Sequence, residues 1–320
     1  MTTDGAMTFV GTDAAEELGA DGVGGITATM GGGDDSVAGT DADDVIDAGA
    51  GLDVVDGRGG NDRCTAAEVV KACEVLSRRA RTAPGCVGRP ATIVGTNGDD
   101  RVEGTPGPDV IAGLAGDDRI DGLAGDDVVC GGPGDDELTS YDVSGDVLVG
   151  GSGDDFVGSF ENPLARVRTG TGDDDVSVAI GLARGWLLDG GSGHDKVYLN
   201  LTRELFDAGP MPGTLDLRRG RLAVGPPGRR VTGTFAGWED LDLPMHVRWR
   251  ATGTGADERW FFEGLQGIQV WTRGGDDEVF GTPGDDVVVT GKGEDTVTAY
   301  GGQDVCRGAE RTRGCEARSR

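Results

Sequence analysis

Apolar and polar positions recur with a fixed period of nine residues along much of this chain. Between residues 94 and 138 an apolar residue occupies every ninth position, and an aspartate precedes each one by two positions. The apolar positions are Val102, Ile111, Ile120, Val129 and Leu138. One apolar side chain in nine residues can be buried only if successive coils stack on one another. The pattern therefore predicts short strands in a stacked solenoid.

Glycines keep the polar half of each repeat in register. Within residues 94–138 one glycine lies two positions before every repeat aspartate and another lies five positions before it, so the unit reads G-x-x-G-x-D-x-U-x, with U apolar. Glycine permits positive φ and close stacking of turns, and the Val, Ile and Leu residues around U favour a strand. An aspartate at the end of such a turn places a carboxylate beside backbone carbonyls. These hard oxygen ligands suit Ca²⁺.

This unit resembles the hemolysin-type calcium-binding (RTX) nonapeptide repeat, GGxGxDxUx. The resemblance implies an all-β fold of right-handed parallel β-roll modules, in which two nonapeptides form one coil and aspartates eighteen residues apart stack on the same edge. It also implies several Ca²⁺ ions, each held between two stacked turns by aspartates and turn carbonyls. The metal ligands expected on this basis are Asp35, Asp44, Asp53, Asp62, Asp100, Asp109, Asp118, Asp127, Asp136, Asp155, Asp174, Asp195, Asp277, Asp286, Asp295 and Asp304.

The repeats fall into two predicted modules. We expect a short calcium-binding β-roll over residues 1–76, a basic linker over residues 77–85 and a longer solenoid over residues 86–320. Residues 65–76 contain no glycine and predict a short helix or an irregular cap at the end of the first module.

The longer module is uneven. Strict repeats cover residues 94–157 and 272–306, whereas residues 198–252 hold no repeat motif but keep short apolar runs between Gly and Pro. We expect this middle part to continue as coils that bind no metal. The four tryptophans at Trp238, Trp249, Trp260 and Trp271 lie eleven residues apart and are expected to fill the core of wider coils.

The six cysteines are even in number and favour three disulfides, with buried reduced thiols as the alternative. Two pairs are nine residues apart, and each follows the last repeat of an array, so a disulfide there would fix the end of the solenoid. Disulfides indicate an oxidising, extracellular setting. The first ten residues lack a basic start and an apolar run, so this expectation rests on the cysteines and the calcium chemistry. The predicted pairs are Cys64–Cys73, Cys86–Cys130 and Cys306–Cys315.

The net charge of −28 predicts a chain that repels nucleic acids and needs cations to become compact. We therefore expect calcium to drive folding, and we expect no membrane-spanning segment. HExxH and GxSxG motifs are absent, which favours a structural or interaction protein over an enzyme. A protein or glycan partner cannot be named from the repeats.

Two other functions stay open at this point. One is the repeat portion of a secreted enzyme whose catalytic part is not recognisable, and the other is a calcium-dependent ice-binding solenoid. The second function needs an unbroken row of threonines. Thr40, Thr96, Thr105 and Thr282 share one turn position, but Leu114, Gly132 and others interrupt the row.

Overall fold

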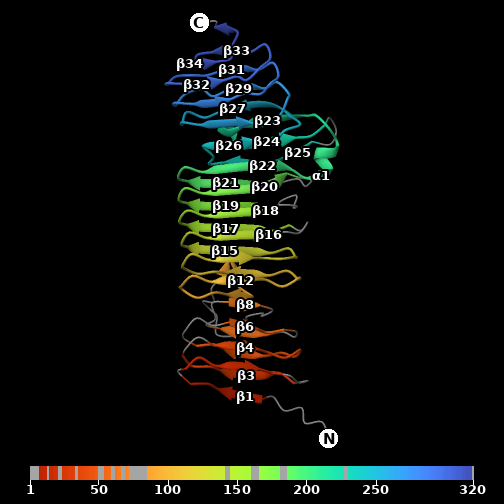
Figure 1. The fold of residues 1–320 in the computed structure, drawn as a ribbon, viewed down its shortest axis with the longest axis vertical. Coiled ribbons are helices and arrows are strands. Elements are labelled where there is room, and N and C mark those ends of the chain that lie inside the picture. The colour runs from red at the N-terminus through yellow and green to blue at the C-terminus, as the bar shows by residue number, and fades with distance from the viewer. Residues whose placement is uncertain are drawn as a thin grey trace. The chain divides into compact units, whose positions relative to one another are not determined.

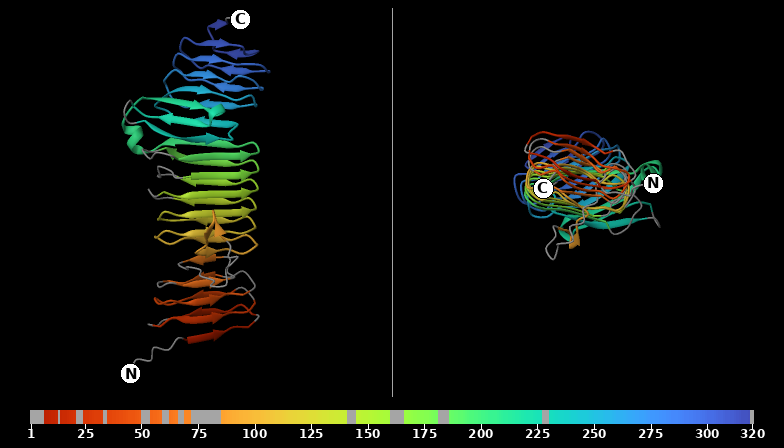
Figure 2. Two further views of the ribbon diagram at one scale, coloured as in Figure 1. Left: turned by 180° about the vertical axis from the view of Figure 1, so that it is seen from behind. Right: turned by 90° about the horizontal axis from the view of Figure 1, so that it is seen from below.

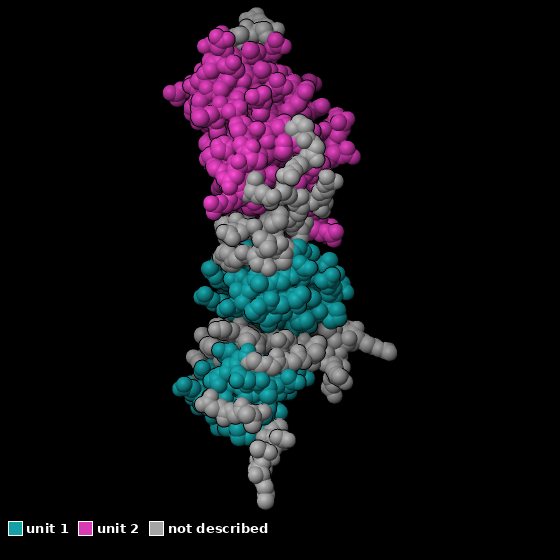
Figure 3. All heavy atoms as spheres, turned by 90° about the vertical axis from the view of Figure 1, so that its right-hand side faces the viewer, with its two compact units in different colours: residues 1–156 teal, residues 157–320 magenta. Residues whose placement is uncertain are grey.

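The computed structural model describes residues 7–12, 14–20, 24–32, 35–49, 54–58, 62–65, 69–71, 85–140, 145–159, 166–180, 186–226 and 230–318. The chain forms two compact units, residues 1–156 and 157–320, which Figure 3 shows in different colours. In each unit short strands stack in parallel walls (Figure 1). This is the all-β, parallel solenoid that the nine-residue period predicted.

Unit 1 is built from three such walls. One wall contains β1 (Met7–Val10), β3 (Ile26–Thr29), β5 (Val45–Asp47) and β7 (Arg63–Thr65). The second contains β2 (Glu17–Gly19), β4 (Ser36–Ala38), β6 (Val54–Asp56), β8 (Val69–Lys71), β12 (Arg101–Glu103), β14 (Arg119–Asp121) and β16 (Glu137–Ser140). The third contains β11 (Ile93–Val94), β13 (Val110–Ala112), β15 (Val128–Pro133) and β17 (Val147–Ser152).

The strand register confirms two nonapeptides per coil. Val102 pairs with Ile120, and Ile120 pairs with Leu138, while Ile111 and Val129 pair in the opposite wall. These apolar side chains are at most 2% exposed. Each coil therefore contributes one apolar side chain from each wall, and stacking completes a thin core.

Residues 69–71 form strand β8, where the sequence predicted a helix or an irregular cap. Val70 pairs in parallel with Val102, so β8 continues the wall that β12 extends. Val69 and Val70 are β-branched residues, which favour a strand over a helix. Residues 72–84 lie outside the described residues, and the module boundary predicted there remains a prediction.

Unit 2 contains two walls. One consists of β20 (Asp175–Ile180), β22 (Lys196–Leu201), β26 (Asp240–Leu243), β28 (Arg259–Phe262), β30 (Glu278–Phe280), β32 (Thr296–Thr298) and β34 (Arg311–Arg313). The other consists of β19 (Arg166–Thr171), β21 (Leu187–Ser192), β25 (Val231–Ala236), β24 (Arg221–Val224), β23 (Met211–Asp216), β27 (Val247–Thr252), β29 (Gln269–Trp271), β31 (Val287–Val289), β33 (Val305–Arg307) and β35 (Ala317–Arg318). Strand β18 (Phe156–Ser159) spans the division between the units in the sequence.

The motif-free middle of unit 2 contains strands, as expected, but not plain coils. A short helix, α1 (Arg203–Asp207), lies beside the strands, and β24 runs antiparallel to both β23 and β25 (Figure 2). The reversal follows η1 (Leu217–Arg219), where the Asp216 carboxylate accepts a hydrogen bond from the Arg219 amide and Gly220 adopts φ 58°. This local turn chemistry, which needs Asp and Gly at those positions, reverses the chain.

Trp238, Trp249 and Trp260 are at most 3% exposed and fill the core as predicted, whereas Trp271, the fourth tryptophan of the series, is only partly buried. Phe235 packs against Trp238 with ring centroids 5.7 Å apart. None of the described helices is long and apolar enough to span a bilayer.

Two of the three predicted disulfides are confirmed. Cys86 of β9 (Gly85–Cys86) is bonded to Cys130 of β15, and Cys306 of β33 is bonded to Cys315. The first bond anchors the hairpin of β9 and β10 (Arg89–Pro90) to the wall of unit 1. Cys73 lies outside the described residues, so the predicted Cys64–Cys73 bond remains a prediction.

Candidate calcium sites in the turns

The repeat aspartates form a hydrogen-bonded ladder along each edge of the walls. The amide of Asp100 donates to Oδ1 of Asp118 at 2.9 Å, and the amide of Asp118 donates to Oδ1 of Asp136 at 2.8 Å. Each aspartate ends a turn directly before a strand, so in a parallel stack its carboxylate reaches the turn one coil earlier. The same bond joins Glu16 to Asp35, Ile26 to Asp44, Asp44 to Asp62, Asp109 to Asp127, Asp136 to Asp155, Asp174 to Asp195, Asp277 to Asp295, Ile268 to Asp286 and Asp286 to Asp304.

The predicted site aspartates therefore stack in pairs one coil apart, and those that the structure describes are buried, with at most 4% exposed. Asp53 is the exception to this account, because it lies outside the described residues. In the part of the chain that the structure describes, no three acidic, His or Cys side chains converge on one point.

A second ladder of exposed aspartates runs in the opposite direction. The amide of Asp117 donates to Oδ1 of Asp99 at 2.9 Å, and the amide of Asp135 donates to Oδ1 of Asp117 at 2.9 Å. The Asp-Asp dipeptide of a repeat thus binds one turn on each side of its own. These outer aspartates leave the inner carboxylates as the charged groups of the buried turn.

Several inner carboxylates keep one oxygen that is buried and has no hydrogen bond. This is the case for Oδ2 of Asp118, Asp136, Asp195, Asp295 and Asp304. A buried carboxylate oxygen without a partner is costly, and a bound cation removes that cost. This observation tests whether the turns fit calcium, and they do.

Backbone carbonyls supply oxygens of the second kind beside these carboxylates. A Cβ atom added to Gly132 would lie 1.8 Å from the Leu114 carbonyl oxygen, and one added to Gly134 would lie 1.9 Å from that of Gly116. The carbonyl of each turn thus occupies the space next to the glycine of the next coil. Both glycines also have positive φ, of 133° and 142°. Glycine is required here for conformation and for close approach. Carboxylates with carbonyls match the oxygen ligands of Ca²⁺.

Burial raises the pKa of these carboxyl groups. Burial lifts the pKa of Asp118 and of Asp195 to about 7 and that of Asp136 to about 6; amide hydrogen bonds oppose the effect and neighbouring carboxylates add to it. Burial likewise raises the pKa of Asp277 to about 6. It also raises the pKa of Asp286 above the usual value for an aspartate. Without a metal ion, Asp118, Asp136 and Asp195 therefore hold their protons up to about pH 6 to 7, and a divalent cation competes with those protons.

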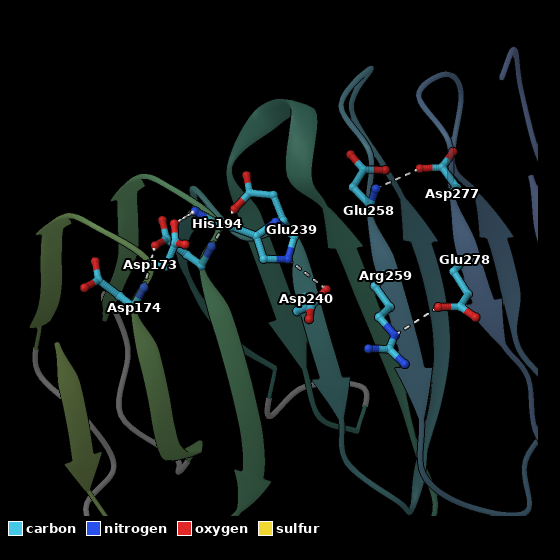
Figure 4. A network of polar contacts seen from close by, with 10 residues as sticks. Asp173, Asp174, His194, Glu239, Asp240, Glu258, Arg259, Asp277 and Glu278 are labelled. Atoms are coloured by element: carbon cyan, nitrogen blue, oxygen red, sulfur yellow. Dashed lines mark hydrogen bonds and ion pairs between the residues drawn. The ribbon is translucent and has the colours of Figure 1, made fainter. Parts of the chain in front are cut away.

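The ladder also contains acidic residues that the nine-residue register did not select. Asp127 donates its amide to Asp146, Asp195 to Glu239, Glu258 to Asp277 and Asp295 to Glu310 (Figure 4 shows part of this row). Their separations of 19, 44, 19 and 15 residues depart from eighteen. Glutamate, with its extra methylene, also replaces aspartate at Glu239, Glu258 and Glu310. An acidic residue two positions before a U residue was the available signal for Asp146 and Glu258.

Comparison with known families agrees with this geometry. The profile of the RTX calcium-binding nonapeptide repeat matches four segments, residues 31–64, 103–138, 144–157 and 271–309. Residues 202–236, an insertion that contains α1 and β24, lie outside these segments. No curated protein matches the chain. The matched segments and the stacked glycine–aspartate turns together show that the chain carries RTX calcium-binding nonapeptide repeats in these four segments.

Proposed function

We propose that the chain is an extracellular structural or interaction protein whose coils are assembled and held by several Ca²⁺ ions, without catalysis of its own. The observation that carries this proposal is the set of buried carboxylate oxygens without hydrogen bonds, including those of Asp118, Asp136 and Asp295. A protein that folded without a cation would leave these oxygens uncompensated. With Ca²⁺ bound, the same oxygens become ligands.

Charge and core size support calcium-dependent folding. The net charge is −28, and the inner carboxylates of successive coils stack one coil apart along each edge. Each repeat buries one principal apolar side chain, a gain smaller than the conformational entropy lost by nine ordered residues. The free energy of metal binding therefore becomes part of the free energy of folding.

The disulfides support a location outside the cell. Cys86–Cys130 and Cys306–Cys315 need an oxidising compartment to form and persist. Extracellular calcium modules commonly bind their ions at about 10⁻⁴ to 10⁻³ M. At such affinities the turns are loaded outside the cell and empty in the cytosol.

The threonine positions argue against an ice-binding surface. Thr40 and Thr282 are each 1% exposed, and their hydroxyls donate to Asp44 and Asp286. These side chains therefore face the carboxylates of their own turns instead of forming a flat outer row.

Far-ultraviolet circular dichroism tests the proposal directly. The full chain is measured in excess chelator, then with Ca²⁺ and separately with Mg²⁺. We expect strand signal to rise with Ca²⁺ and to respond far less to Mg²⁺, because Mg²⁺ demands a compact octahedral site. Full strand signal in chelator, unchanged by Ca²⁺, would contradict metal-driven folding.

A further inference from the structure

Two turns of the chain differ in a single residue, and the carboxylates they carry differ in their hydrogen bonds. Residues 131–136 read GGPGDD and residues 281–286 read GTPGDD, so only Gly132 and Thr282 distinguish them. Asp136 and Asp286 end these turns, and both are at most 2% exposed. The pair isolates what a threonine does at the fourth position before the aspartate.

In the threonine turn both carboxylate oxygens are hydrogen-bonded. The Thr282 amide donates to Oδ2 of Asp286 at 2.7 Å, and the Thr282 hydroxyl donates to Oδ1 at 2.9 Å. The hydroxyl also accepts from the Gly284 amide at 3.1 Å, which closes a local serine/threonine turn. The Ile268 amide, one coil earlier, donates to Oδ1 at 2.9 Å. The carboxylate is satisfied without a metal ion.

In the glycine turn one oxygen is left over. Oδ1 of Asp136 accepts from the Asp118 amide at 2.8 Å, but Oδ2 is buried without a hydrogen bond. Gly132 has φ 133°, and a Cβ there would meet the Leu114 carbonyl at 1.8 Å. A threonine cannot adopt this conformation without moving the backbone. The residue at this position therefore selects between two turn conformations.

The same division holds elsewhere in the chain. Amides of Thr40, Thr96 and Thr105 donate to Oδ2 of Asp44, Asp100 and Asp109 at 2.7, 2.5 and 2.7 Å. By contrast Leu114, Gly191, Gly291 and Tyr300 stand at this position before the aspartates with an unbonded oxygen, Asp118, Asp195, Asp295 and Asp304. Glu258 is intermediate, since Thr254 bonds only to Oε1 and Oε2 stays unbonded.

We propose that a threonine four residues before the aspartate makes a turn calcium-free, and that Ca²⁺ loads only at the turns without it. The threonine amide and hydroxyl occupy the carboxylate oxygens that an ion would otherwise take. This inference rests on the proposed function, because it presumes that the remaining turns bind calcium. It assigns Asp44, Asp100, Asp109 and Asp286 a structural role and removes them from the predicted ligands.

The turns that carry such a threonine lie at positions where a metal-independent turn would be useful for folding. Thr96 and Thr105 occupy the first two repeats of residues 94–138, one before β12 and one before β13. Both edges of this array thus begin with a turn whose carboxylate accepts the amide and hydroxyl hydrogen bonds of its own threonine. Such turns form a metal-independent first layer on which calcium-loaded coils stack.

Calcium stoichiometry of full-length variants, measured by isothermal titration, tests the inference. Thr282→Gly converts GTPGDD into the sequence of the turn at residues 131–136, and we expect it to bind at least one additional ion. Thr282→Ser keeps the amide and the hydroxyl, and we expect the wild-type number. Circular dichroism in Ca²⁺ confirms that each variant is folded.

Removing the carboxylates gives the complementary measurement. We expect Asp286→Asn to leave the number of bound ions unchanged and Asp136→Asn to lower it by at least one. If Asp286→Asn lowers the number, or if Thr282→Gly leaves it unchanged, the inference is wrong while the proposed function stands. If wild-type protein takes up no calcium at all, the proposed function itself fails.

Discussion

The amide of Asp118 donates a hydrogen bond of 2.8 Å to the Asp136 carboxylate, which lies one coil ahead. The inner ladder made of such bonds means that each aspartate supports the backbone of a neighbouring turn besides its own. Loss of one carboxylate therefore leaves a backbone amide in a different repeat without its hydrogen-bond acceptor.

We predict that Asp136→Ala destabilises the calcium-loaded chain by about 1–3 kcal/mol or more, because it leaves the Asp118 amide unbonded and removes a ligand. Asp135→Ala is the matched control. Asp135 is exposed, and its carboxylate accepts a hydrogen bond from the Asp154 amide on the outside of the turn. Urea unfolding in saturating Ca²⁺ gives both values, and equal losses would show that the buried ladder has no special role.

A second prediction concerns pH. Burial raises the pKa of Asp118 from 3.8 to about 7 and that of Asp136 to about 6, so the folded calcium-free chain binds more protons than the unfolded chain. Stability from these groups is fully present below about pH 4 and is lost as pH rises through 6 to 7. In chelator we therefore expect the chain to resist urea better at about pH 5 than at about pH 8.

The calcium-loaded chain should show the opposite trend, because Ca²⁺ displaces the same protons. We expect calcium affinity to rise between about pH 5 and about pH 8, with protons released on binding. Titrations in two buffers with different ionisation enthalpies measure that release. Binding without proton release in the acid half of this range would contradict the raised pKa values.

The third prediction concerns the glycines that stack between coils. Gly134→Ala should lower stability by about 1–3 kcal/mol, because φ is 142° and the new Cβ would lie 1.9 Å from the Gly116 carbonyl oxygen. Gly255→Ala is the control, since a Cβ there meets nothing within 4 Å. Thermal unfolding in Ca²⁺ compares the two. We expect the control to melt with the wild type.

The fourth prediction concerns the disulfide between Cys86 and Cys130, which closes a loop with a sequence separation of 44. Replacing both residues by serine should lower stability by about 2–4 kcal/mol through the unfolded chain. Unit 1 should be affected first, because both residues belong to it. Mass spectrometry of a non-reduced digest reports this pair, Cys306–Cys315 and the predicted Cys64–Cys73 bond. Peptides with crossed pairs would overturn the assignment.

Much of the fold could be predicted because the strict spacing of the repeat determines which residues pair between successive coils. Val102, Ile120 and Leu138 occupy one wall, as their eighteen-residue spacing required. The Cys306–Cys315 bond followed from the same half-coil spacing. Because the period is strict and the core is thin, there are few other ways to bury these side chains.

The insertion was beyond such reasoning, because no period covers residues 202–236 and the reversal at Gly220 depends on a local cap at Asp216. The place of Glu239 in the ladder could not be predicted for the same reason, because the insertion separates it from Asp195 by 44 residues. The role of Thr282 was also hidden. Its position was visible in the sequence, but the sequence does not show that its amide and hydroxyl are directed at Asp286.

The insertion also stores length. Lys196 of β22 pairs directly with Asp240 of β26, so one wall advances by a single strand while the chain advances by 44 residues. An ordinary coil, such as that from Arg101 to Arg119, uses 18. When fully extended at ~3.4 Å per residue, the 44-residue coil would span about 150 Å and the 18-residue coil about 60 Å. A chain pulled from its ends would thus gain far more length from this coil than from an ordinary one, which makes the coil an extensible element of unit 2.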